Sequence, residues 1–261
     1  MDVTHEASNL PMFSWPGSTR PSTRSFVRNS ILARISLQDL AALREFLEPI
    51  VLTERMVLHE PKKSLDHVYF IEGGLVSLRI VAAGSILETA VIGYQGAVGA
   101  SSLLGGHLPT HQSVVIFPGS AHRIHVEDLR HLMNDRAGIR EHLSRYVQAL
   151  TLHCAQTGLC GVRHNREKRL ACWICLASDA IDAHVLPITH DYLSSVLGLR
   201  RAGVTETLIR FEEQGLIHKM RGVLRVDEDR CLEQKACSCY KLISGAYAAC
   251  EPETAAAETV L

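Results

Sequence analysis

The spacing of hydrophobic positions changes several times along the chain, and each change marks a stretch with a different predicted structure. Residues 1–28 are rich in Ser, Thr and Pro and show little periodicity, so we expect a disordered arm there. Ser36, a good helix-capping residue, opens a stretch to Leu47 in which leucines recur at helical spacing. This stretch predicts a short helix.

From residue 50 to about 126 the hydrophobic period becomes two, which is typical of strands. The pair Gly73-Gly74 predicts a turn that makes residues 68–81 a hairpin. Further short strands, separated by Gly and Pro, are expected at residues 56–59, 86–92, 113–116 and 121–125. Many short strands at this spacing predict an antiparallel, jelly-roll-like β-roll over residues 29–134.

Residues 135–163 return to a helical pattern and predict one long central helix. Its hydrophobic positions have the a/d spacing of a coiled-coil seam, and two more polar residues continue the register: Ile139, Leu143, Tyr146, Leu150, His153 and Thr157. We interpret this seam as a dimerisation element, while packing of the helix on its own domain remains open. Residues 161–165 interrupt the pattern as a possible hinge, and another helix is expected from about 166 to 181.

Residues 187–217 predict two short amphipathic helices joined by a tight turn. Thr189 is suited to cap the first helix, and Gly198 permits the sharp turn that follows it. The second helix is expected from about residue 201 to 213, ending at Gly215. Its outward side chains are of small or polar types that can reach phosphates and base edges: Arg201, Ala202, Thr205, Glu206 and Arg210.

A pair of short strands after these helices predicts a wing. Lys219, Arg221 and Gly222 form a basic turn between residues 216–217 and 223–226. Together the elements indicate a winged helix-turn-helix within residues 164–240, followed by a tail at 241–261. The predicted class is α+β: an N-terminal antiparallel β-roll, a long central dimerisation helix and a C-terminal winged helix-turn-helix. Two consecutive short helices also occur in globular proteins that bind no DNA.

Composition narrows the function without deciding it. The 261 residues carry a formal net charge of −1, which gives no overall basic signature of an indiscriminate nucleic-acid binder. Residues 188–226 hold six Lys/Arg against four Asp/Glu, a net charge of +2. No apolar run approaches the length of a membrane span and no secretory signal is apparent, so we expect a cytoplasmic protein with no membrane partner.

The order of these stretches resembles the Crp/Fnr family of bacterial transcription regulators over nearly the whole chain after residue 29. The resemblance depends on DHVYFIEGGLVSL in the roll, HNREKRLACWI in the hinge helix, ITHDYLSSVLGLRRAGVTETLIRFEEQGLI in the helix-turn-helix and RGVLRV in the wing. It implies that the roll is a cyclic-nucleotide-binding-like sensory domain. It also implies a homodimer on a near-palindromic site in double-stranded DNA, with recognition helices about one helical turn apart. RNA polymerase is the further partner that it implies.

Within this family resemblance, several candidate DNA-binding residues have more than one expected contact. Arg201 can pair bidentately with guanine or contact a phosphate, and Glu206 can accept from cytosine or pair with Arg210. Ala202 and Thr205 can touch a thymine methyl group. Thr189 is first a helix cap, and the residues best suited to phosphate contacts are Arg200, Lys219 and Arg221. Many family members have Glu and Arg where this chain has Ala202 and Glu206, so the familiar target sites do not follow.

The predicted effector pocket also departs from the family. In cyclic-nucleotide-binding members the corresponding loop holds a Glu for the ribose and an Arg for the cyclic phosphate. This chain has Gly99, Ala100 and Ser101, then His111 and Gln112, with no Arg from residue 96 to 120. Without that cation we expect no cyclic AMP binding of the usual kind.

Eight cysteines raise the question of a metal or redox role. Cys172 and Cys175 have the spacing of half a zinc or cluster site, which Cys154, Cys160, Cys237 and Cys239 could complete. Because the pair falls inside an amphipathic helix, we interpret it as buried hydrophobic packing and predict no metal and no cofactor. The fourteen histidines are scattered and match no catalytic motif, so we predict no catalytic residues and no enzyme. Two alternatives remain: a redox- or metal-responsive regulator, and a roll that signals through a protein partner.

Overall fold

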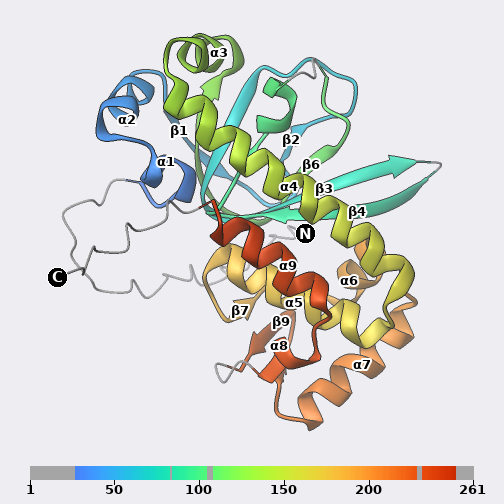
Figure 1. Cartoon of the computed structure of the whole chain (residues 1–261). Coiled ribbons are helices and arrows are strands. Elements are labelled where there is room, and N and C mark those ends of the chain that lie inside the picture. The colour runs from blue at the N-terminus through green and yellow to red at the C-terminus, as the bar shows by residue number, and fades with distance from the viewer. Residues whose placement is uncertain (1–26, 83, 105–107, 228–230, 251–261) are drawn as a thin grey trace, which may run out of the picture.

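The computed structural model describes residues 27–82, 84–104, 108–227 and 231–250, which form two units joined by a long helix (Figure 1). The predicted disordered arm lies almost wholly outside these residues, as does the tail from residue 251. Helix α4, Ala137–Arg163, runs beside the N-terminal roll and reaches the C-terminal unit. Within the described part of the chain, no helix is long and apolar enough to cross a membrane.

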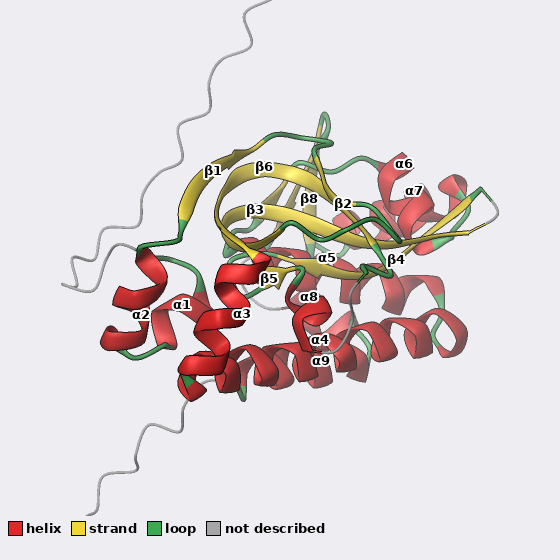
Figure 2. Ribbon diagram, turned by 90° about the horizontal axis from the view of Figure 1, so that it is seen from above, coloured by secondary structure: helices red, strands yellow, loops and turns green. Residues whose placement is uncertain are grey.

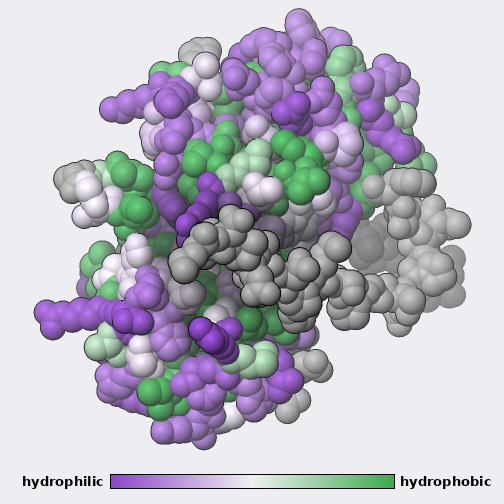
Figure 3. Space-filling view, turned by 180° about the vertical axis from the view of Figure 1, so that it is seen from behind, coloured by the Kyte–Doolittle hydropathy of each residue, from purple (hydrophilic) through white to green (hydrophobic). Residues whose placement is uncertain are grey.

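The N-terminal unit is built on an antiparallel sheet, as predicted. Its strands are β1 Glu48–Leu52, β2 Val57–His59, β3 His67–Ala82, β4 Ser85–Ile92, β5 Ala97–Val98 and β6 Gln112–His125. The main path is β1-β6-β3-β4, with β2 on β6 and β5 on β3. Figure 2 shows the sheet curling over the helices beneath it. Seen from behind, hydrophilic side chains cover much of the roll, the upper part of Figure 3.

The Gly73-Gly74 hairpin turn was a wrong prediction. Strand β3 continues through both glycines, and its register against β6 shifts on either side of Gly73. Gly74 has φ +87°, and a Cβ at Gly119 on β6 would lie 2.1 Å from the Gly73 carbonyl oxygen. The glycines therefore bend two strands that cross closely, and the chain reverses later, between β3 and β4. The two strands predicted at 113–116 and 121–125 are likewise one strand, β6.

Short helices close one side of the roll. They are α1 Ser30–Arg34, α2 Leu37–Arg44, the 3₁₀ turn η1 Ala100–Leu104 and α3 Val126–Asp135. The Ser36 side chain caps α2 as predicted, accepting a bond of 3.1 Å from the Asp39 backbone N–H. The helix ends at Arg44, three residues before the predicted Leu47.

The predicted dimerisation seam of α4 faces the protomer's own core, which corrects its assignment to a partner. Five of its six side chains are buried in the single chain: Ile139, Leu143, Tyr146, Leu150 and His153. The first four belong to the hydrophobic core of the roll, and Thr157 is half-buried. The a/d spacing was real, but it marks the face of α4 that packs against the roll. Leu159 and Val162 remain 47 % and 84 % exposed, so a partner copy would have to meet another face.

The C-terminal unit has its own hydrophobic core. Its elements are α5 Arg166–Ile181, β7 Val185–Leu186, α6 His190–Leu197, α7 Arg201–Glu213, β8 Ile217–Met220, β9 Val223–Val226, α8 Cys231–Lys235 and α9 Ser238–Ala248. Three strands form a small sheet in the order β7-β9-β8. Helix α9 extends beyond the predicted wing domain and lies beside α4 (Figures 1 and 2). The described start of the predicted tail is therefore helical.

A buried carboxylate joins the roll to the C-terminal unit. Glu88 of β4 is 4 % exposed and accepts hydrogen bonds from Ser77 on β3 and Trp173 on α5. It also accepts from the Tyr192 hydroxyl on α6, at 2.7 Å. The Arg79 guanidinium lies 5.6 Å from the centre of the Tyr192 ring. Burial raises the pKa of Glu88 against the opposing effect of its donors. We name Glu88, Ser77, Trp173 and Tyr192 the Glu88 junction.

A second contact between the units depends on a glycine. The Tyr94 backbone N–H donates a hydrogen bond of 3.0 Å to the Ala180 carbonyl near the end of α5, a length typical of a backbone bond. A Cβ at Gly93 would lie 1.8 Å from that same carbonyl oxygen. Since no real side chain tolerates this approach, the turn after β4 fits against α5 because residue 93 is glycine.

Candidate nucleic-acid interface

The turn between α6 and α7 follows from local capping chemistry. The Thr189 hydroxyl accepts from the Tyr192 backbone N–H at 3.2 Å and so caps α6, as predicted. Gly198 ends the helix with φ +59°, and the Leu199 N–H returns to the Ser194 carbonyl at 2.9 Å. Helix α7 then begins at Arg201, the predicted residue, and ends at Glu213.

Helix α7 has one buried and one exposed face. Val204, Leu208 and Phe211 are each 0 % exposed and anchor the helix in the C-terminal core. Four of the predicted DNA-contacting residues lie exposed on the helix: Arg201, Ala202, Glu206 and Arg210. The hydrophobic face thus fixes the helix, while the opposite face presents charged and small side chains to solvent.

Arg201, at the start of α7, forms an ion pair across the turn. Its Nε lies 2.6 Å from a carboxylate oxygen of Asp191, and the two side chains are 69 % and 68 % exposed. An ion pair this open to water contributes little stability, because solvent screens it. The Arg201 guanidinium can therefore exchange Asp191 for another acceptor at small cost.

Glu206 is held by two cations on the same surface. Arg210 contacts it one turn along α7, and the Arg166 guanidinium of α5 reaches it at 3.0 Å. The Arg210 hydrogen bond is the main reason that the pKa of Glu206 is lowered. The intrahelical pairing considered from the sequence is thus present. A Cβ at Gly203 would lie 2.4 Å from Arg166 Nη1, so a larger residue there would displace the Arg166 side chain.

Thr205 is less available than its exposed neighbours. It is half-buried, and its hydroxyl lies 2.9 Å from His190 Nδ1 on α6. Burial lowers the pKa of His190, and the Lys219 and Arg201 charges act in the same direction. Thr205 therefore ties α7 to α6 through its hydroxyl.

The wing lies beside the start of both helices. Lys219 Nζ is 2.8 Å from Glu212, while Arg221 is exposed next to Gly222, which has φ +72°. A hollow between the wing and the two helices is lined in part by Thr189, Arg201, Lys219 and Gly222. The fold thus brings three predicted DNA-contacting residues, from separate segments, to one concave surface. Arg200 is exposed just before α7.

The predicted effector residues have contacts of their own. Ala100 is buried, Gly99 has φ +94°, and Ser101 is exposed. His111 Nδ1 lies 2.8 Å from the Thr110 hydroxyl, and Gln112 donates to the Glu60 carboxylate at 3.2 Å. None of the five residues lines the cavity between the roll, α4, α5 and α9, whose lining includes Tyr146, His153 and Tyr247.

Sequence reasoning missed the residues that hold this surface in place. Asp191, His190 and Arg166 contact three of the predicted DNA-contacting residues, which are Arg201, Thr205 and Glu206. One signal was available: a glycine within a helix often marks the close approach of another group, which here is Arg166 over Gly203.

Comparisons with known proteins bear on this architecture. Residues 168–233 match the model of the Crp-like helix-turn-helix domain. A crp/fnr-family transcriptional regulator from Eubacterium rectale superposes with a TM-score of 0.61 at 15% identity, over 79% of this chain and 97% of its own. FixK2 from Bradyrhizobium japonicum gives 0.63 at 15%, over 73% and 98%.

A third solved structure agrees with these two. It is CLP, a c-di-GMP responsive global regulator of Xanthomonas campestris, with a TM-score of 0.61 at 14% identity over 73% of this chain and 99% of its own. A search of curated protein sequences finds no match. At these identities the structural likeness concerns the fold, and it confirms the resemblance seen in the sequence. The chain has the fold of the Crp/Fnr transcription regulators and carries a Crp-like helix-turn-helix domain.

Proposed function

We propose that this protein is a sequence-specific DNA-binding transcription regulator that acts as a homodimer, with α7 as its recognition helix. The observation that carries the proposal is the exposed polar face of α7 beside the hollow that the wing completes. An α-helix fits the major groove of B-DNA, and 13 residues give α7 a length of about 20 Å.

Each exposed residue has a role that its present contacts permit. Arg201 would leave Asp191 for guanine or a phosphate, and Glu206 would accept from cytosine while Arg166 and Arg210 hold it. Ala202 is small enough to admit a thymine methyl group, and the methyl group of Thr205 is a second candidate for this contact. The residues proposed to contact phosphates are Thr189, Arg200, Arg210, Lys219 and Arg221.

The proposed dimer uses the outward face of α4 in place of the predicted seam. Leu152, Ala155, Leu159 and Val162 follow one another at spacings of three, four and three residues, and we name them the outward strip. Ala155, Leu159 and Val162 are exposed, and Leu152 is half-buried. The a/d spacing and the exposure of Leu159 and Val162 support contact with a second copy.

Introducing charged residues tests whether the outward strip is the dimer interface. The double substitution Leu159→Arg and Val162→Arg should convert a dimer to a monomer in light scattering, because two-fold symmetry places like charges together. Leu37→Arg, at another exposed leucine, is the matched control and should leave the mass unchanged. A double variant that stays dimeric would refute the outward strip as the interface, and a monomeric wild type on DNA would refute the homodimer.

The roll is the proposed sensory unit, residues 29–134, with 135–163 as the dimerisation helix and 164–240 as the DNA-binding unit. The Glu88 junction supports this division of labour, because it connects β4 of the roll directly to Tyr192 on α6. A shift of the β3-β4 hairpin would move α6, and α7 with it. The effector residues proposed from the sequence are Gly99, Ala100, Ser101, His111 and Gln112. RNA polymerase is the proposed further partner, and action on DNA implies a cytoplasmic site.

Selection of genomic fragments tests the proposed activity. The full-length protein is mixed with fragmented bacterial DNA, bound fragments are recovered over several rounds, and the enriched sequences are compared. We expect a motif with two related halves separated by about one helical turn, and affinity that falls with added salt. Recovery of no enriched motif would contradict DNA reading and favour a roll that signals through a protein partner.

A further inference from the structure

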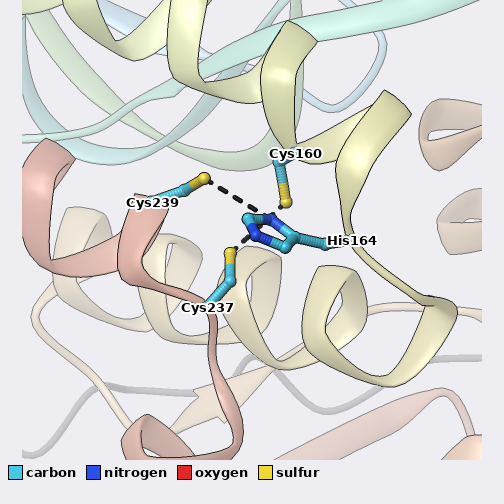
Figure 4. A group of neighbouring side chains, drawn as sticks. All are labelled: Cys160, His164, Cys237 and Cys239. Atoms are coloured by element: carbon cyan, nitrogen blue, oxygen red, sulfur yellow. Dashed lines mark hydrogen bonds between the residues drawn. The ribbon is translucent and has the colours of Figure 1, made fainter.

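Four potential metal ligands converge where α4 ends. Cys160 lies in the last turn of α4, His164 follows directly after the helix, and Cys237 and Cys239 stand at the start of α9. Their ligand atoms all lie within 4.8 Å of one another. Figure 4 shows the three sulfur atoms grouped around the His164 ring. Segments more than 70 residues apart in the sequence thus meet at one point.

The spacing of these atoms fits a single tetrahedral ion. Cys160 Sγ lies 3.4 Å from Cys237 Sγ, and Cys239 Sγ lies 3.6 Å from His164 Nδ1. With zinc–sulfur bonds of about 2.3 Å and zinc–nitrogen bonds of about 2.0 Å, tetrahedral ligands stand about 3.8 Å (S to S) and about 3.5 Å (S to N) apart. Both distances are within about 0.4 Å of these values, so small side-chain adjustments would bring the four ligands to tetrahedral positions.

The surroundings suit a structural site. The three thiols are buried, with 6 %, 5 % and 1 % of Cys160, Cys237 and Cys239 exposed, and His164 is half-buried. Cys172 contacts Cys160 and Cys237 from α5 but does not join the group of four. Cys175, its partner in the C-x-x-C spacing, lies elsewhere. The buried Cys172 and Cys175 agree with the packing role predicted for the C-x-x-C pair, while the group of four forms because its members converge in space.

We infer that Cys160, His164, Cys237 and Cys239 form a zinc site that fastens the start of α9 to the end of α4. Three thiolates and an imidazole are the ligand set of a closed structural Zn²⁺ site. The close spacing favours one ion over an iron–sulfur cluster, whose several metal atoms hold the cysteine sulfurs farther apart. This inference revises the prediction of no metal ligands.

The position of the site also connects zinc to DNA binding, a consequence that rests on the proposed function. Residues 164 and 165 separate α4 from α5, so the site lies at the link between the central helix and the DNA-binding unit. Zinc bound there would restrain that link and keep α9 against α4. Loss of zinc would free α9, lower the stability of the C-terminal unit and weaken binding of DNA.

Metal content tests the inference independently of DNA. The full-length wild-type protein, purified in reducing buffer without chelator, should contain about one zinc ion per chain when measured by elemental mass spectrometry. His164→Ala and Cys237→Ser should each retain much less zinc. Cys175→Ala is the matched control, because Cys175 is an equally buried cysteine outside the group, and it should keep the wild-type zinc content.

Cobalt substitution guards against variants that fail to fold. Wild-type protein stripped of zinc and titrated with Co²⁺ should develop the visible bands of a tetrahedral, thiolate-rich site at one equivalent. Iron with acid-labile sulfide in place of zinc would overturn the single-ion assignment. Wild-type protein that binds neither zinc nor cobalt, or a Cys160–Cys237 disulfide persisting in reducing buffer, would overturn the site. If a variant bound DNA more weakly while its zinc content stayed at the wild-type value, the result would bear only on the proposed DNA-binding function.

Discussion

Helix α7, the proposed recognition helix, and the Glu88 junction are both rich in polar side chains, but they differ in exposure to solvent. On α7 the Arg201–Asp191 pair is about 70 % exposed on both sides, so its partners can separate at small cost. At the junction Glu88 is 4 % exposed and holds donors from three elements. Polar groups of the first kind are available to a ligand, whereas those of the second kind fix how two units sit together.

This difference separates binding from architecture within one small region. Tyr192 of α6 belongs to the junction, while Asp191 beside it faces Arg201. Adjacent residues on one helix therefore point to the roll and to the proposed DNA surface. Substitutions at the junction should change stability first, and substitutions on α7 should change DNA affinity first.

The largest effect is expected from Glu88→Ala. It leaves the Trp173 N–H and the Tyr192 hydroxyl without their buried acceptor, and each unsatisfied group costs about 1–3 kcal/mol. We therefore expect the free energy of unfolding to fall by about 3 kcal/mol in denaturant titration. Glu127→Ala, at a surface glutamate paired with Arg130, is the control and should change it by less than about 0.5 kcal/mol. If the two variants were equally stable, the buried Glu88 would contribute no more to stability than an exposed glutamate, which would contradict this account.

Arg201→Ala should show the reverse pattern. Loss of a bidentate base contact costs about 1–3 kcal/mol, so affinity for a selected DNA site should fall about 10- to 100-fold in fluorescence anisotropy. The free energy of unfolding should stay within about 0.5 kcal/mol of wild type, because the Asp191 pair is exposed. Arg130→Ala, on the roll, serves as the control for net charge. An unchanged affinity would exclude Arg201 from the contact.

The pH dependence of stability tests whether burial controls the protonation of Glu88 at the junction. Because burial raises the pKa of Glu88 above its ordinary 4.5, the native state holds a proton that the unfolded chain releases more readily. The stability of wild type should therefore fall, relative to Glu88→Gln, as pH rises from about 4.5 through the raised pKa. Paired unfolding titrations across pH measure this difference. A flat difference, or one that favours wild type as pH rises, would show that the donors and Arg79 outweigh burial.

The smallest effect is expected from Arg221→Ala at the wing tip. A phosphate contact contributes to affinity without reading sequence, so binding should weaken about equally on selected and unrelated DNA. The slope of log affinity against log salt should become shallower by about one. Lys241→Ala, on α9 and away from the wing, should keep the wild-type slope. An Arg221 variant with an unchanged slope would place the wing off the DNA backbone.

The sequence was most informative where structure is local. Thr189, Gly198 and the hydrophobic positions of α7 act on neighbours within a few residues, so the helix-turn-helix bounds followed from them. The Gly73-Gly74 prediction failed because glycine permits a turn and a bend equally, and only the crossing with Gly119 decides between them.

Features that depend on distant segments could not be read in the same way. The a/d spacing of α4 identified side chains that share a face, but the sequence does not say whether the roll or a second chain covers it. Glu88 gave no signal, because its donors come from positions 77, 173 and 192. The convergence of His164 with Cys237 and Cys239 likewise arises only when α9 folds back along α4.

The central claim is that α7 reads DNA in a two-fold assembly, and a hydroxyl-radical footprint on a selected fragment tests it most directly. Two protected segments should appear about one helical turn, or about 34 Å, apart, and both should weaken together with Arg201→Ala. A bound complex that shows one protected segment, or a footprint that Arg201→Ala leaves unchanged, would contradict the account.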